Sequence, residues 1–236
     1  MWLRTLLAIV ATLAVATAGS VWAQTAERVD VALDAGHSRA DVGAAGFGLR
    51  EYEATLDLAW RVRAELEARG MTVRMTRTDD QPLTPLLRPA DTEDIRLEQQ
   101  ARIAAGLPAW VFVSLHFNGG PVSLRGTETY FNPQRDDRAA VRDRALADMV
   151  QAAALASLDE IGYPITDRGA KSDLTAGKPY GHFFSLRGPI PSVLLELLFL
   201  SNPRDAAWAA DPATLDTLAQ GLARSIRGYL DAFPED

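Results

Sequence analysis

The sequence has 236 residues, of which 47% are hydrophobic and 23% charged, a composition typical of a folded globular protein. Its formal net charge of −7 argues against nucleic acid as a partner, because phosphate binding requires a basic surface. There is no cysteine, which excludes disulfides, thiolate metal ligands and cysteine nucleophiles. Protein ligands for a metal must therefore come from Asp, Glu and the three histidines.

The first 23 residues are typical of a secretory signal peptide. Arg4 precedes an apolar run at about 6–18, and the small residues Val21 and Ala23 suit cleavage after Ala23. The apolar run is short for a membrane span, which needs roughly 20 residues. The alternative is an uncleaved N-terminal anchor. We expect residues 1–23 to be removed, leaving residues 24–236 as one domain that is secreted, or placed in the periplasm or cell wall, without a membrane span.

After residue 24 the chain alternates short apolar segments with amphipathic ones. Strands are expected at 29–34, 71–77, 110–115, 126–131 and 193–200, and helices at 51–69, 92–105, 136–161 and 212–233. Residues 81–91, which contain three prolines, and the polar residues 163–181 are expected to be loops. This order of elements predicts a single α/β domain on a largely parallel sheet.

Two of the three histidines follow predicted strands. Gly36 permits a sharp turn after strand 29–34, just before His37, and His116 directly follows strand 110–115. In open α/β sheets, ligands bind at the carboxyl ends of the strands. The two histidines are either unrelated loop residues or two ligands of one metal ion. The second interpretation has support because imidazole is the commonest metal ligand among protein side chains.

Glu51 begins the first helix after a glycine-rich loop. A carboxylate in a first helical turn is ordinary, because it complements the helix dipole. Together with the two histidines, however, it would complete a His₂Glu zinc site with an open position. Glu53 is the competing candidate. Residues two apart on a helix face different sides, so only one of them should point at the histidines.

Glu196 interrupts the apolar strand 193–200. Because a buried carboxylate without a partner is costly, Glu196 should lie at an exposed strand end, pair with a cation such as Arg187, or serve as a general base next to a metal. Low polarity would raise its pKa and a nearby cation would lower it.

Four further residues lie in segments expected near this edge of the sheet. Asn118, His182 and Arg187 are candidates for holding a substrate, and the alternatives for His182 are a structural role or a fourth metal ligand. Arg77 ends the second strand and is expected to be a surface or ion-pair residue.

Six stretches of the chain, in this order, resemble one known family: LDAGHSRADVGAAG, LREYEATLDLA, TVRMTRTDD, VFVSLHFNG, RGAK and VLLELLFLSNPRD. They cover nearly all of residues 28–232 and are similar to the zinc-dependent N-acetylmuramoyl-L-alanine amidases of the amidase_3 family. The resemblance implies helices on both faces of the sheet, Zn²⁺ bound by His37, Glu51 and His116, and Glu196 as the catalytic carboxylate. The alignment of EYEATLDLA with the family's motif favours Glu51 over Glu53 as the metal ligand.

The resemblance also implies the reaction. Members hydrolyse the amide bond between N-acetylmuramic acid and L-alanine in peptidoglycan, and some carry an inserted helix that blocks the site until a protein activator removes it. Only residues 91–100 could form such a helix here. The chain departs from the family pattern at Ala35, Ser38, Phe117 and Leu198 and over the long segment 172–188. These departures concern substrate fit, because Phe117 and the long segment are expected near the cleft.

Two alternative functions are weighed against the same residues. A zinc carboxypeptidase would use an arginine such as Arg187 to bind the free carboxylate of a peptide. A wall-binding or activator protein without catalysis would have no need of the metal ligands or of Glu196.

Overall fold

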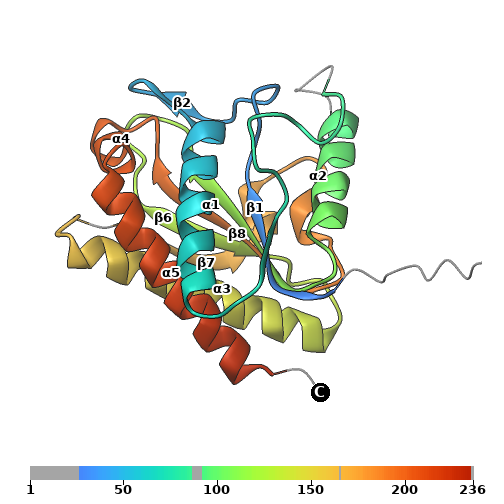
Figure 1. The fold of residues 1–236 in the computed structure, drawn as a ribbon. Coiled ribbons are helices and arrows are strands. Elements are labelled where there is room, and N and C mark those ends of the chain that lie inside the picture. Colours follow the sequence, from blue (N-terminus) through green and yellow to red (C-terminus); the bar gives the residue numbers. More distant parts are fainter. Residues whose placement is uncertain (1–26, 87–91, 165, 235–236) are drawn as a thin grey trace, which may run out of the picture.

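The computed structural model describes residues 27–86, 92–164 and 166–234, so the predicted signal peptide lies outside the described residues. Figure 1 shows a central sheet enclosed by helices. Within the described ranges, no helix is long and apolar enough to cross a membrane.

The sheet has six strands in the order β4, β1, β5, β8, β6, β7. Their bounds are Val73–Met75 (β4), Val29–Ala35 (β1), Ala109–Asn118 (β5), Ser192–Phe199 (β8), Thr127–Phe131 (β6) and Asp167–Ser172 (β7). The first four strands run parallel. Strand β6 is antiparallel to β8, and β7 runs parallel to β6. The predicted α/β domain with a largely parallel sheet is confirmed.

Helices cover both faces of the sheet, as expected. Helices α1 (Glu51–Ala68), α3 (Asp137–Glu160) and α5 (Pro212–Ala232) lie against one face, and α2 (Thr92–Gly106) lies on the other beside the short 3₁₀ helix η2 (Phe184–Leu186) (Figure 1). Strand alternation explains the division, because successive side chains point to opposite faces. Leu33 packs in the main core with Leu58 of α1, whereas Ala32 and Phe112 form a smaller cluster with Ile103 of α2.

One predicted loop is wrong in part. Residues 163–181 contain β7 and the 3₁₀ helix η1 (Asp173–Ala176). The sequence of β7, DRGAKS, is polar and lacks β-branched residues, so nothing in it favours a strand. Its pairing with β6 fixes the extended conformation, and its Arg168 and Lys171 both bind Glu128 of β6.

A short helix and a short hairpin were among the elements that were not predicted. Helix α4 (Pro203–Ala209) begins after Asn202, whose side chain accepts hydrogen bonds from the Arg204 and Asp205 amides. Strands β2 (Ala45–Gly46) and β3 (Leu49–Arg50) form a hairpin that leads directly into α1. This hairpin fixes where α1 begins, and so places Glu51 close to the carboxyl ends of β1 and β5.

Candidate active site

Three side chains from separate elements meet at the carboxyl ends of β1 and β5. His37 follows β1, Glu51 opens α1 and His116 lies near the end of β5, and one ligand atom of each lies within 4.8 Å of the others. Oε1 of Glu51 is 3.3 Å from Nε2 of His37 and 3.0 Å from Nδ1 of His116. Tetrahedral zinc with bonds of about 2.0–2.1 Å has edges of roughly 3.3 Å between donors. The two contacts of Glu51 are close to this spacing, and the donor set fits a metal ion.

Glu51, and not Glu53, faces the histidines. Glu51 is buried, and its two carboxylate oxygens accept hydrogen bonds from the Ala44 amide at 2.6 Å and the Phe117 amide at 3.1 Å. Glu53 is exposed and pairs with Arg50. Burial would raise the pKa of Glu51, but the two histidines outweigh it and hold the pKa well below its usual value. The carboxylate is therefore ionised and held in place by the backbone.

His37 occupies a strained backbone position with a carboxylate behind its ring. Its φ of 59° is in the left-handed region, which costs a residue other than glycine about 1–3 kcal/mol. Nδ1 of His37 donates to Oδ2 of Asp41 at 2.8 Å, which leaves Nε2 free to bind a metal. No feature of the sequence identified Asp41, which lies in a loop of small and charged residues.

Two glycines leave room for the ligands. A methyl group at Gly36 would lie 2.4 Å from Cε1 of His116, and one at Gly43 would lie 2.4 Å from Oε2 of Glu51. Gly43 also has a φ of 71°, which disfavours any side chain. These positions therefore require glycine for the packing of the ligand side chains.

The ligands open onto a cavity with a volume of about 180 Å³. It is lined by His37, Asp41, Ile95, Gln99, His116, Lys178, Tyr180, Phe183, Phe184, Ser185, Leu194 and Glu196. The long segment 172–188 thus lies at the cavity, as expected, and so does α2. Phe117 does not, because its side chain is buried in the main core and only its amide reaches Glu51. The expectation that Phe117 lies near the cleft is wrong, since its side chain points to the opposite face of β5 from His116.

Glu196 lies next to His116, its partner in the register of β5 and β8. Its Oε2 is buried and has no hydrogen-bond partner in the described chain, like Nε2 of His116 and Oε1 of Gln99. Buried polar atoms without partners are rare in folded proteins. Burial and the nearby charge of Glu51 raise the pKa of Glu196 to about 8. This carboxylate therefore has the setting of a group that exchanges protons.

None of the three predicted substrate contacts is among the residues that line the cavity. Asn118 donates to Glu128, and His182 contacts Asp173 and Gln134. Arg187 is exposed, donates to the carbonyls of Tyr180 and His182, and lies over the Phe184 ring. Arg187 is thus bound to the segment that forms the cavity wall.

Comparison with known proteins places this arrangement in a family. Residues 31–228 match the model of Amidase_3, described as N-acetylmuramoyl-L-alanine amidase. The chain is 32% identical over 212 residues to YqiI of Bacillus subtilis, an uncharacterised protein, and this match covers 89% of the chain and 90% of YqiI. It is 29% identical over 199 residues to the N-acetylmuramoyl-L-alanine amidase LytC of the same organism, covering 84% of the chain and 34% of LytC.

Among solved structures, the catalytic domain of CwlV, an N-acetylmuramoyl-L-alanine amidase from Bacillus (Paenibacillus) polymyxa var. colistinus, is similar in fold and sequence. The TM-score is 0.68 and the identity 30%, and the match covers 86% of this chain and 98% of the CwlV chain. The family model, the relative LytC and this solved structure all carry the same description, N-acetylmuramoyl-L-alanine amidase. The chain therefore belongs to the Amidase_3 family of N-acetylmuramoyl-L-alanine amidases.

Proposed function

We propose that this cavity hydrolyses the amide bond between N-acetylmuramic acid and L-alanine of peptidoglycan with a zinc ion held by His37, Glu51 and His116. Peptidoglycan amidase activity is the activity of the family. Two imidazoles and one carboxylate, with a cavity beside them, are a donor set typical of catalytic zinc. When bound there, zinc supplies Lewis-acid chemistry that polarises a carbonyl group and eases deprotonation of water.

Glu196 is proposed as the group that moves the proton. Its unpartnered Oε2 next to His116 is the observation that carries this assignment. The carboxylate takes a proton from the attacking water as the new C–O bond forms at the lactyl carbonyl. As the C–N bond breaks, Glu196 returns the proton to the leaving nitrogen of L-alanine. A cation in the site would lower the pKa of Glu196 from about 8 towards neutrality, where one group serves as both base and acid.

The wall of the cavity suits a peptide attached to a sugar. Tyr180 and Phe184 are stacked, with ring centroids 4.4 Å apart, and with Phe183 they present aromatic surface to the cavity. We retain Asn118, His182 and Arg187 as proposed substrate contacts that act from the rim. Alanine variants of such residues should raise KM and leave kcat nearly unchanged.

The family acts on the cell wall, and therefore outside the cytoplasm. We infer that residues 1–23 are a signal peptide cleaved after Ala23, and that residues 24–236 form the catalytic domain in the periplasm or cell wall, or in secreted form. Sequencing the amino terminus of the exported protein tests this, with Gln24 as the expected first residue. We also propose that a protein activator regulates the site. Full activity of the purified protein alone would contradict a requirement for this activator.

Metal removal and replacement tests the zinc proposal. The purified protein would be stripped with a chelator, dialysed, and assayed for release of dye-labelled fragments from cell wall. Activity should disappear on stripping and return with Zn²⁺ but not with Mg²⁺, because imidazole ligands suit zinc and magnesium prefers oxygen. Full activity of the stripped protein would contradict a zinc mechanism. Wall binding without release, in the presence of zinc, would favour the non-catalytic alternative.

A further inference from the structure

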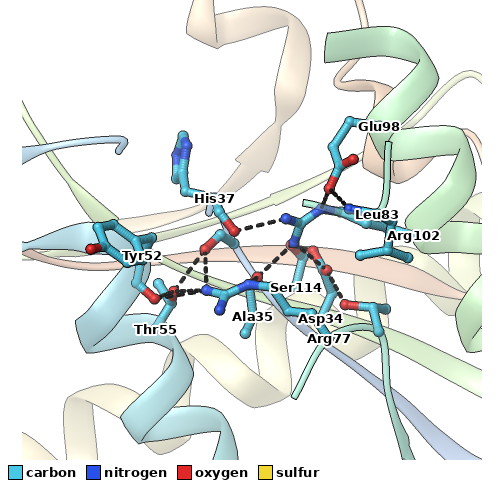
Figure 2. Close-up of polar contacts among 12 residues, drawn as sticks. Asp34, Ala35, His37, Tyr52, Thr55, Arg77, Leu83, Glu98, Arg102 and Ser114 are labelled. Atoms are coloured by element: carbon cyan, nitrogen blue, oxygen red, sulfur yellow. Dashed lines mark hydrogen bonds and ion pairs between the residues drawn. The ribbon is translucent and has the colours of Figure 1, made fainter. Parts of the chain in front are cut away.

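The backbone that carries His37 is held by two buried arginines. Arg77 follows β4 and Arg102 lies on α2, and their exposed fractions are 4% and 1%. Figure 2 shows both guanidinium groups directed at the backbone after β1, while the His37 ring points away from them. The expectation that Arg77 is a surface or ion-pair residue is wrong, because its side chain is buried and binds carbonyl groups.

Arg102 spans the turn that leads to His37. Nη1 donates to the Ala35 carbonyl at 2.6 Å, and Nη2 donates to the His37 carbonyl at 2.7 Å. The guanidinium is itself fixed by two carboxylates, Asp34 at 3.1 Å and Glu98 at 2.9 Å. The planar guanidinium has five N–H donors and can bind the two carbonyls and the two carboxylates at once. The ammonium group of a lysine cannot do so with the same geometry.

Arg77 binds the same turn from the other side. Nε donates to the Ala35 carbonyl at 2.8 Å, and Nη2 donates to the Gly36 carbonyl at 2.9 Å. The hydroxyl of Thr55, from α1, donates to the Gly36 carbonyl at 2.7 Å. Side chains from α1, from α2 and from the loop after β4 therefore bind the carbonyls of Ala35, Gly36 and His37.

This arrangement places two like charges close together in the interior. Burial and the positive charge of Arg102 lower the pKa of Arg77 to about 10. Burial would raise the pKa of Asp34, but Arg102 and the hydroxyls of Ser114 and Thr76 outweigh it and hold the pKa below its usual value. Asp34 and Glu98 both form their ion pairs with Arg102, whereas the contacts of the Arg77 guanidinium described above are to carbonyl groups. Buried charges of this kind contribute little net stability, so their geometric effect is the better explanation for their presence.

The two arginines restrain the backbone at His37, which is a strained residue. His37 has a φ of 59°, and the carbonyls on both sides of its own φ torsion, those of Gly36 and His37, are bound by the arginines. A strained backbone persists only where its surroundings hold it. We propose that Arg77 and Arg102, the arginine clamp, are positioning residues that hold His37 in the conformation required for metal binding. The inference rests on the proposed metal centre and concerns its affinity, independently of turnover.

The test is the zinc dissociation constant, measured by competition with a chromophoric chelator. Arg102→Lys keeps the charge beside Asp34 but cannot span the carbonyls of Ala35 and His37. Loss of groups that orient metal ligands typically weakens binding about 10- to 100-fold, and we expect an effect of this size. Far-UV circular dichroism of the metal-free variant checks its fold. If Arg102→Lys does not fold, Arg77→Lys, which loses the fork on Ala35 and Gly36, replaces it.

A matched control separates the clamp from general effects of a buried arginine. Arg135 is largely buried, pairs with buried Asp143 at 3.0 Å and donates to the Ile190 carbonyl at 2.6 Å, just before the opposite end of β8. Arg135→Lys should change the zinc dissociation constant less than about twofold, since it touches no ligand segment.

A double-mutant cycle tests whether the clamp acts through His37. In a His37→Ala background, Arg102→Lys should weaken zinc binding less than about twofold, because the group it positions is gone. Unchanged zinc binding by Arg102→Lys, or an equal loss with and without His37, would overturn the clamp and leave the metal centre intact. An absence of zinc binding by the wild-type protein would overturn the metal centre and the clamp together.

Discussion

His116 and Glu196 are direct partners in the register of β5 and β8. Adjacent parallel strands bring their side chains to the same face of the sheet, at the end where His37 and Glu51 also lie. Sheet pairing alone thus makes a proposed metal ligand the neighbour of a carboxylate whose Oε2 has no hydrogen-bond partner among the described residues. The proposed chemistry depends on this pair.

Glu196→Gln should retain the metal and lose turnover. The amide has nearly the shape of the carboxylate but cannot accept the proton, and a general base typically contributes about 100- to 10,000-fold to the rate. Zinc content by mass spectrometry and fragment release from cell wall measure the two effects separately. Activity close to that of the wild type would show that Glu196 is not the base.

Glu51→Gln and Glu53→Gln form a matched pair on the first turn of α1. Glu51 touches both histidines and should be needed for zinc binding, whereas Glu53 is exposed and pairs with Arg50. We expect Glu51→Gln to lose most of its bound zinc after dialysis and Glu53→Gln to keep it. Equal zinc content in the two variants would remove Glu51 from the ligand set.

Gly36→Ala should disturb His116, although Gly36 has no side chain of its own and is not a candidate ligand. The added methyl group would lie 2.4 Å from the His116 ring, and overpacking of this kind typically costs about 1–3 kcal/mol. Zinc affinity and the free energy of unfolding should both fall. Gly228→Ala on α5 is the control, because its methyl group meets only Met149 at 3.6 Å and alanine favours a helix. Wild-type zinc affinity in Gly36→Ala would show that the ring has room to move.

Asp143 should make stability depend on pH. Burial raises its pKa from 3.8 to about 6, despite its pairing with Arg135. Between these values the folded state binds more protons than the unfolded state, so stability falls as pH rises from about 4 to about 7. At about 1.4 kcal/mol per pKa unit, the difference is on the order of 3 kcal/mol. Denaturant unfolding across this range should show a steeper fall for the wild type than for Asp143→Asn, and parallel curves would contradict it.

The sequence predicted the elements whose patterns are local. The apolar strands and amphipathic helices were found within a few residues, because burial of one face leaves a periodic signal. His37, Glu51 and His116 could be singled out because histidines are scarce and each predicted strand end places its loop at one edge of the sheet. Strand β7 was missed, since its conformation comes from pairing with β6 and its own residues are polar.

Contacts that follow no periodic pattern left no such signal. Arg102 binds the His37 carbonyl across 65 positions, and Asp41 binds the His37 ring from a loop without periodicity. The side chain of Phe117 faces the core because strand β5 continues to Asn118, beyond the end predicted at residue 115. The residues that hold the candidate ligands in place could therefore be identified only from the structure.

Mass spectrometry of cell wall digested by the purified protein, with zinc and with a chelator, tests the central claim most directly. We expect free stem peptides that begin at alanine, together with glycan that lacks peptide, and both only when zinc is present. Shortened peptides still attached to glycan would contradict it and would indicate the carboxypeptidase alternative.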